Sequence, residues 1–168
     1  MKRFLLIAFL ISGSLFSQNI KDLTKSAIRD AKAVSEASVK QDTRTLIKYT
    51  HPKIIQKHGK LKTMEIIDDV FGMMGAQHIK ILSSTINEVG EIKEENGEYR
   101  CLVTNTIIMD LNGRKVTVNS SLFGFYNKQT QTWSFIESSK LFVDPETQDI
   151  FPDFKTSIFI PEDEYIEG

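Results

Sequence analysis

The chain has 168 residues, of which 40% are hydrophobic and 26% are charged, and its formal net charge at pH 7 is −1. This length favours one domain with its own core, and the balanced charge excludes the basic stripe typical of nucleic-acid-binding proteins. Cys101 is the only cysteine, so no disulfide can form within the chain. Its position in an apolar run favours a small core residue over a reactive thiol.

The first 17 residues have the pattern of a secretory signal peptide. Lys2 and Arg3 precede an apolar run over residues 4–16, and Ser17 offers a small residue for cleavage. The run is shorter than the roughly 20 residues that cross a bilayer, although a buried helix or a short anchor is the alternative interpretation. We therefore predict an exported protein, periplasmic or secreted, whose mature chain has no membrane span and carries 19 basic and 22 acidic residues.

Helical patterns fill the first part of the predicted mature chain. Over residues 20–40, apolar and small side chains recur every three or four positions, which is the spacing of an amphipathic helix. These side chains are Ile20, Leu23, Ala27, Ala31 and Val34. Asp42 is the expected N-cap of a short second helix.

A helical corner is expected next. Pro52 should break the chain near His51 and open a further turn, because proline suits the first position of a helix. Gly59 should end that turn, and Thr63 should cap a third helix that reaches Gly75. The apolar stripe of this third helix comprises Met64, Ile67, Val70, Phe71 and Met74.

From residue 78 onward, the hydrophobic period changes to two, which is typical of strands. Four strands are predicted, over residues 78–89, 99–110, 114–126 and 132–138. The pairs Asn96-Gly97 and Asn112-Gly113 predict tight hairpin turns, so the strands should form an antiparallel meander. Asp144-Pro145 should then begin a short helix that ends before Pro152.

These elements predict an α+β fold in which three N-terminal helices pack on one face of a curved antiparallel sheet of about four strands. The other face is expected to be solvated or paired with a second subunit. A short helix and a tail complete the chain, and the acidic tail, residues 161–168, should be solvated. The predicted organisation is a signal peptide over 1–17, one domain over 18–142 and a C-terminal extension over 143–168.

The chain resembles the superfamily of nuclear transport factor 2 and ketosteroid isomerase over roughly residues 20–140. The resemblance is carried by the helix–hairpin–helix start, by "YTHP" at the end of the second helix and by the closing strand "WSFIE". "KYTHPKII", "YRCLV" and the late "IP" are similar to a group of secreted bacterial proteins in this superfamily.

The resemblance implies a cone in which the sheet curls around the helices and leaves an opening at one end. It also implies dimerisation through the outer sheet face. Isomerase members use an aspartate base together with a tyrosine and a protonated acid. Tyr49 and Asp69 are the nearest residue types here, but no local motif aligns them with that set.

His51 and His58 stand seven positions apart in "KYTHPKIIQKHG" and invite a metal or acid–base interpretation. No metal or other cofactor is expected, because their spacing matches no known ligand pattern and only His78 could join them. The helical corner accounts for both residues more simply. His58 would interact with a helix C-terminus, and His51 would bond backbone at the break or line the opening of the cone.

Polar residues within the strands add to the candidate pocket. Asn105 interrupts an otherwise apolar row and needs a partner if it is buried, which a ligand, backbone or water could supply. The full set of predicted pocket residues is Tyr49, His51, Phe71, Met74, Asn105 and Asn119. At helical spacing, however, apolar residues such as Phe71 and Met74 are more often plain core than pocket lining.

Three functions are therefore open, and no catalytic residue is assigned. The first is a noncatalytic, exported domain that binds a small apolar ligand or a protein segment in its cone, as a homodimer. The second is an assembly partner that uses the outer sheet face and the acidic tail. The third is an isomerase- or cyclase-type enzyme with Tyr49, His51 or Asp69 as base.

Overall fold

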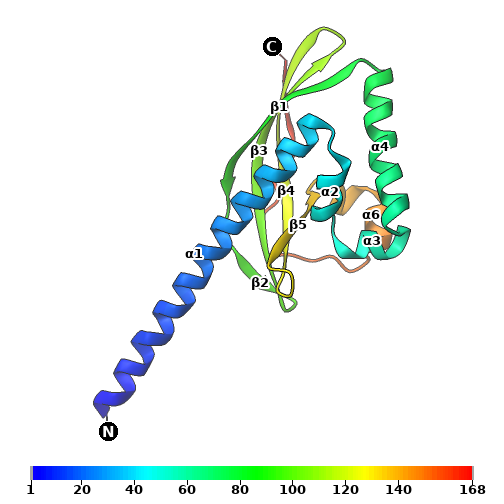
Figure 1. The fold of residues 1–168 in the computed structure, drawn as a ribbon. Helices are drawn as coiled ribbons and strands as arrows, with labels where there is room; N and C mark the ends of the chain where they lie inside the picture. The colour runs from blue at the N-terminus through cyan, green and yellow to red at the C-terminus, as the bar shows by residue number, and fades with distance from the viewer. Residues whose placement is uncertain (1, 168) are drawn as a thin grey trace.

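An antiparallel sheet of six strands forms the centre of the molecule; four helices precede it in the chain, and two short ones lie between its last two strands (Figure 1). The computed structural model describes the backbone of residues 2–167 and the side chains of residues 20–166. The helices are α1 (Lys2–Lys40), α2 (Thr43–Tyr49), α3 (Pro52–His58), α4 (Lys60–Ala76), α5 (Lys140–Val143) and α6 (Pro145–Ile150). The strands are β1 (Ile79–Val89), β2 (Lys93–Glu95), β3 (Glu98–Leu111), β4 (Arg114–Asn127), β5 (Thr132–Glu137) and β6 (Glu164–Glu167). The predicted α+β class is confirmed, with six strands instead of about four.

The predicted signal peptide, residues 1–17, lies outside the residues whose side chains are described, so it stays a prediction. Helix α1 runs through this segment to Lys40, and only its part from Ile20 onward is described below. Among the described residues, no helix is long and apolar enough to cross a membrane.

The strands form the predicted antiparallel meander, in the order β1-β3-β4-β5. Both Asn-Gly pairs form the turns that flank β3. Asn96 and Gly97 have φ angles of 53° and 80°, and Asn112 and Gly113 have φ angles of 56° and 88°. These left-handed angles match the turn type that joins two twisted strands most readily.

The acidic tail is largely exposed, as expected for a solvated segment, but its last residues also pair with the sheet. Residues 164–167 form β6, which pairs with Val116–Asn119 of β4 while its side chains stay largely exposed. Strand β4 is much longer than β5, so this part of its edge has backbone groups free to pair with another strand. The Asn119 Nδ2 also donates a hydrogen bond of 3.0 Å to the Glu164 Oε2.

The helical corner forms mainly as predicted. His51 is the N-cap of α3, Pro52 is its first residue, and Gly59 ends it with a φ of 81°. The prediction of three helices is wrong, because α3 is a separate helix between α2 and α4. Helix α4 begins at Lys60, and Thr63 does not cap it but donates its hydroxyl to the Gly59 carbonyl at 2.9 Å.

Helix α1 covers one face of the sheet, which we call the inner face. The hydrophobic core between this helix and the sheet contains Leu23, Ala27, Ala31, Cys101, Val103, Trp133 and Phe135. Gly124 makes this packing possible, since a Cβ there would lie 3.1 Å from both the Trp133 and Phe135 rings. Cys101 is a core residue, as predicted, and burial raises the pKa of its thiol to about 12.

A buried carboxylate joins α1 to the edge strand β5. The Asp30 Oδ2 accepts a hydrogen bond of 2.9 Å from the Trp133 backbone N–H, and its Oδ1 accepts one of 2.7 Å from the Arg29 Nε. The Trp133 indole donates to the Ser26 Oγ at 3.0 Å. Because β5 is an edge strand, the Trp133 backbone N–H needs a partner outside the sheet, and Asp30 of α1 supplies it.

The opposite, outer face carries a second hydrophobic core. Residues 140–160, which we call the C-terminal segment, fold back over it and bring Leu141 and Phe151 against the sheet. The sheet contributes Leu102, Phe123, Phe125 and Ile136. The expectation that this face is solvated or paired with a second subunit is therefore wrong for the part under the C-terminal segment.

Arg100 lies at the centre of this attachment and is only 6% exposed. Its guanidinium donates to the Glu98 Oε1 at 2.6 and 3.0 Å, and to the Lys155 carbonyl at 2.8 Å. It lies over the rings of Phe125 and Phe154, at 5.5 and 5.3 Å from their centroids. Arg100 thus connects β3 to the C-terminal segment by charge, hydrogen bonds and packing.

Glu95 extends this network. It accepts hydrogen bonds of 2.7 Å from both the backbone N–H and the hydroxyl of Ser157, and it lies 3.4 Å from the Arg100 Nη1. These bonds hold the pKa of Glu95 below its usual value even though burial alone would raise it. The β2–β3 hairpin therefore holds the C-terminal segment in place.

The Arg100→Met variant should lower the free energy of unfolding by about 3 kcal/mol, because it leaves Glu95 and Glu98 without their buried cation. Methionine retains an apolar stem against the two phenylalanine rings, so the loss should report charge and hydrogen bonds. Limited proteolysis should also cut within residues 151–160 much faster than in the wild type. Urea denaturation and timed digestion measure these two effects.

The Lys128→Met variant is the matched control. Lys128 pairs with Glu94 at 2.8 Å, but both side chains are about half exposed, so its loss should cost below about 1 kcal/mol. Equal stability losses in the two variants would contradict the role given to Arg100.

Candidate functional site

A cavity of about 210 Å³ lies between α1 and the inner face of the sheet, and we call it the inner cavity. Its apolar walls come from Val34, Ile81, Ile107 and Leu122. Its polar residues are Ser35, Ser38, Ser84, Asn105, Ser120 and Glu137. The cavity is thus mainly apolar, with hydroxyl and amide groups on two sides.

Asn105 is the buried polar residue of the inner cavity, at 3% exposure. Its Oδ1 accepts a hydrogen bond of 3.0 Å from the Ser120 Oγ, its cross-strand neighbour. Its Nδ2 makes no hydrogen bond among the described residues. The nitrogen is not completely buried, because it keeps some accessible surface. The amide nitrogen is therefore accessible from the cavity and can donate to a molecule inside it.

A second polar pair lies across the cavity. The Ser84 Oγ of β1 donates a hydrogen bond of 3.0 Å to the Ser35 Oγ of α1. Ser38 differs, because its hydroxyl bonds the Val34 carbonyl of its own helix at 3.0 Å. Glu137, the acidic residue of the lining, is exposed and pairs with Lys140 at 2.9 Å. It therefore lies at the rim of the cavity.

Asn105 is the one member of the predicted pocket set that lines the inner cavity. Asn119 lies on the opposite face of the sheet, because Asn105 pairs with Ser120 and neighbouring residues of a strand alternate in direction. Its Oδ1 accepts from the Thr106 Oγ1 at 2.9 Å and its Nδ2 bonds Glu164. Asn119 therefore lies outside the inner cavity.

The helical candidates also lie outside the inner cavity. Phe71 and Met74 are half-buried on α4, where Thr63 is the buried residue. Val70, expected on the same buried stripe, is 44% exposed. Tyr49 packs against the inner core, and burial together with nearby Asp30 raises the pKa of its phenol. These residues are packing positions in this structure.

His51 lies in a different place, at the edge of the outer core. Its Nδ1 accepts a hydrogen bond of 3.2 Å from the Lys53 backbone N–H, which makes it a side-chain cap for α3. Its ring meets the edges of Phe125 and Phe151, with centroids 4.7 and 4.9 Å apart. The prediction that His51 bonds backbone at the helix break is confirmed.

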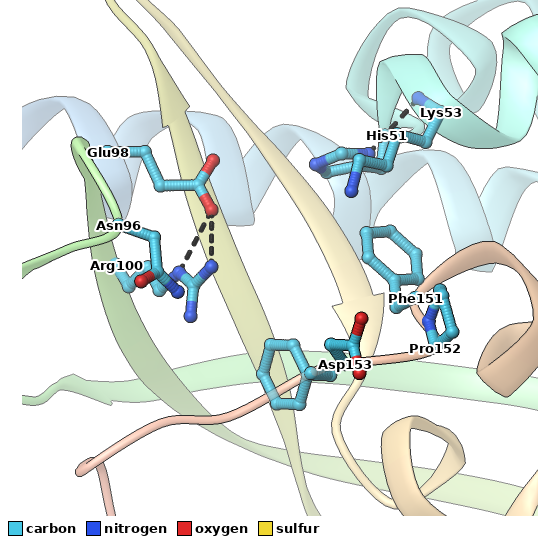
Figure 2. A pocket seen from close by; sticks show the side chains of 9 residues that line it. His51, Lys53, Asn96, Glu98, Arg100, Phe151, Pro152 and Asp153 are labelled. Atoms are coloured by element: carbon cyan, nitrogen blue, oxygen red, sulfur yellow. Dashed lines mark hydrogen bonds and ion pairs between the residues drawn. The ribbon is translucent and has the colours of Figure 1, made fainter.

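His51 also lines a pocket of about 370 Å³, which we call the outer pocket. Figure 2 shows His51 and Lys53 on one side of it, Glu98 and Arg100 on the other, and residues of the C-terminal segment below. This pocket was not predicted from the sequence, because its walls lie far apart in the chain. The sequence feature that could have indicated this pocket is Arg100, a charged residue within the otherwise mainly apolar strand segment "YRCLV".

Burial lowers the pKa of His51 to about 4, with further lowering by the charges of Lys53 and Arg100. The imidazole is therefore neutral at pH 7. Because its Nδ1 accepts a hydrogen bond, the ring proton belongs to Nε2. His51 is thus a hydrogen-bond donor toward the outer pocket and a poor base at neutral pH.

The two histidines of the corner do not act together. The His58 Nε2 faces the Glu146 Oε1 at 3.2 Å, between α3 and α6. Among the described residues, no group of three or more His, Cys, Asp or Glu side chains is placed to hold a metal ion.

The residues weighed as an enzymatic base do not converge either. Tyr49 packs on the inner core, His51 lies at the outer core, and Asp69 is exposed on α4. No protein-family model matches the chain, and no curated protein is significantly similar to it in sequence.

Stability should fall by about 2 kcal/mol between pH 7 and pH 5 because of His51 alone. The unfolded imidazole takes up a proton near its ordinary pKa of 6.5, whereas the folded one does so near a pKa of about 4. The unfolded state therefore binds more protons within this window, and stability is lost as pH falls through it. Urea denaturation at both pH values measures the loss.

The His51→Asn variant should lack this part of the pH dependence, because asparagine caps a helix well but does not titrate. The remaining dependence, from carboxylates and the other histidines, is common to both proteins. Identical pH slopes for the variant and the wild type would overturn the assignment to His51.

Proposed function

We propose that the chain is an exported, noncatalytic binding domain that takes a small, mainly apolar ligand between α1 and the sheet. The resemblance to the nuclear transport factor 2 and ketosteroid isomerase superfamily supports this proposal. In that superfamily the sheet forms a cone around the helices, and a cavity between α1 and the sheet is what such a resemblance leads us to expect. Export rests on the signal-peptide pattern of residues 1–17.

The observation that carries the proposal is the Asn105 amide, which is only 3% exposed and has an unused donor toward the cavity. Because this nitrogen is accessible, water can bond it in the empty protein, and a ligand that displaces the water must offer an acceptor to keep the hydrogen bond. A ligand with an oxygen acceptor would do so, and its apolar body would contact Val34, Ile107 and Leu122. The ligand class is therefore a small ketone, ester or ether with an apolar body.

The cavity volume limits the size of this ligand. About 210 Å³ corresponds to about seven water volumes of roughly 30 Å³ each. This is below the roughly 300–1,000 Å³ typical of pockets for drug-sized ligands. A molecule of about six to ten non-hydrogen atoms is thus the expected order of size.

An assembly role is the second candidate, and helix α4 favours it. Ile66, Val70 and Met73, at i, i+4 and i+7 on one face of this helix, are 37%, 44% and 58% exposed. Apolar surface of this kind is common at interaction sites. A homodimer through the sheet would have to use the outer surface left open by the C-terminal segment. Native mass spectrometry of the protein from its own cells separates these roles by the mass of whatever remains bound.

Binding of cyclohexanone should test the ligand proposal directly. Its carbonyl can accept from Asn105, whereas methylenecyclohexane has a similar shape without the oxygen. NMR titration should show saturable shifts of the Asn105 side-chain amide for the ketone, with at least fivefold weaker binding of the hydrocarbon. The Ser38→Leu variant, which fills the cavity without orphaning a polar partner, should weaken ketone binding at least tenfold.

The Thr24→Leu variant is the matched control, because Thr24 also bonds a carbonyl of α1, that of Ile20 at 3.0 Å, but lies outside the cavity. It should leave ketone binding unchanged. Unsaturable shifts, or equal effects of the two variants, would refute binding in the inner cavity.

A further inference from the structure

We propose that the outer pocket is a second binding site, which takes the carboxylate of a small monocarboxylic acid with an aromatic or apolar body. The carboxylate would lie between the His51 Nε2–H and the Lys53 ammonium. The apolar body would lie against Phe151 and Phe154. This site is on the opposite face of the sheet from the inner cavity and does not depend on the function proposed for it.

The first support is a buried hydrogen-bond donor that points into the pocket. His51 is 7% exposed, and its Nδ1 is already used by the Lys53 backbone N–H. Its Nε2 makes no hydrogen bond among the described residues, and this nitrogen keeps some accessible surface. In Figure 2 the ring points across the pocket toward Glu98 and Arg100. An acceptor within the pocket would satisfy this donor.

The second support is the charge around His51. Lys53 forms no ion pair among the described residues, and its Nζ lies 5.1 Å from the centroid of the Phe151 ring. Arg100 is already committed to Glu98, Glu95 and the Lys155 carbonyl. Lys53 is therefore the cation available to a ligand, next to a neutral donor.

The acidic residues that line the outer pocket limit the negative charge that a ligand can carry. Glu98 shares its Oε1 with Arg100 at 2.6 Å, which offsets part of its charge, because Arg100 also pairs with Glu95. Asp153 is exposed and forms no ion pair among the described residues. A single carboxylate fits one cation and one neutral donor, whereas a second acidic group would approach Asp153. This favours monocarboxylic acids over dicarboxylates and phosphates.

The third support is the apolar wall beside these polar groups. Phe151 is buried and stacks on Phe125 at a centroid distance of 5.8 Å. Phe154 is half-buried and packs edge-on against Phe123 at 5.2 Å. Both rings are held by the outer core, so they form a fixed surface. The volume of about 370 Å³ accommodates one aromatic ring with a short acidic side chain.

Phenylacetate and its neutral analogue phenylacetamide are suitable probes. In NMR titrations of the full chain labelled with ¹⁵N-histidine, phenylacetate should shift the His51 Nε2 resonance in a saturable way. Phenylacetamide should bind at least tenfold more weakly, because it lacks the charge that Lys53 recognises. The absence of a saturable shift for phenylacetate, or equal affinity for the two probes, would overturn the proposal.

Two variants with the same charge change locate the site. Lys53→Gln should weaken phenylacetate binding about fivefold, and Lys60→Gln, which lies outside the pocket, should leave it unchanged. The ¹H–¹⁵N spectrum of each variant shows whether the fold is retained. Equal weakening by both variants would mean that phenylacetate is attracted by the overall charge, and would overturn the assignment.

Discussion

The buried guanidinium of Arg100 determines how the outer half of the molecule is organised. A charge removed from water requires compensating partners, and Arg100 finds them in Glu98, Glu95 and the Lys155 carbonyl. The last of these lies 55 residues further along the chain. The C-terminal segment must therefore return to the β2–β3 hairpin. Its return covers Phe123 and Phe125, completes the outer core and forms one wall of the outer pocket.

The sheet consequently separates two chemically different sites. On the inner face, α1 and the sheet enclose a small, mainly apolar cavity with one buried amide donor. On the outer face, the hairpin, α3 and the C-terminal segment enclose a pocket with charged residues and aromatic rings. His51 belongs to the outer site, although its sequence neighbour Tyr49 packs on the inner core. The helical corner between α2 and α3 thus connects the two sides of the sheet.

Local features were predictable from the sequence, and long-range ones were not. Hydrophobic period, helix caps and the Asn-Gly turns act within a few residues, so most helices and the four strands of the meander were predicted correctly. The opposite orientation of Asn105 and Asn119 could also have been derived, because a two-residue turn at Asn112-Gly113 places Asn105 opposite Ser120. In contrast, the contacts of Arg100 with Lys155 and Ser157 with Glu95 have no local signal. The outer core, β6 and the outer pocket depend on such contacts and were missed.

The central claim is that the C-terminal segment packs on the outer face of the sheet around Arg100. Nuclear Overhauser contacts between aromatic side chains test it most directly in the wild-type protein. We predict cross-peaks from the Phe154 ring to both Phe123 and Phe125, whose centroids lie 5.2 and 6.1 Å away. We also predict a protected Ser157 backbone amide, since that N–H is bonded to Glu95. Absence of these cross-peaks, with random-coil chemical shifts over residues 151–160, would contradict the claim.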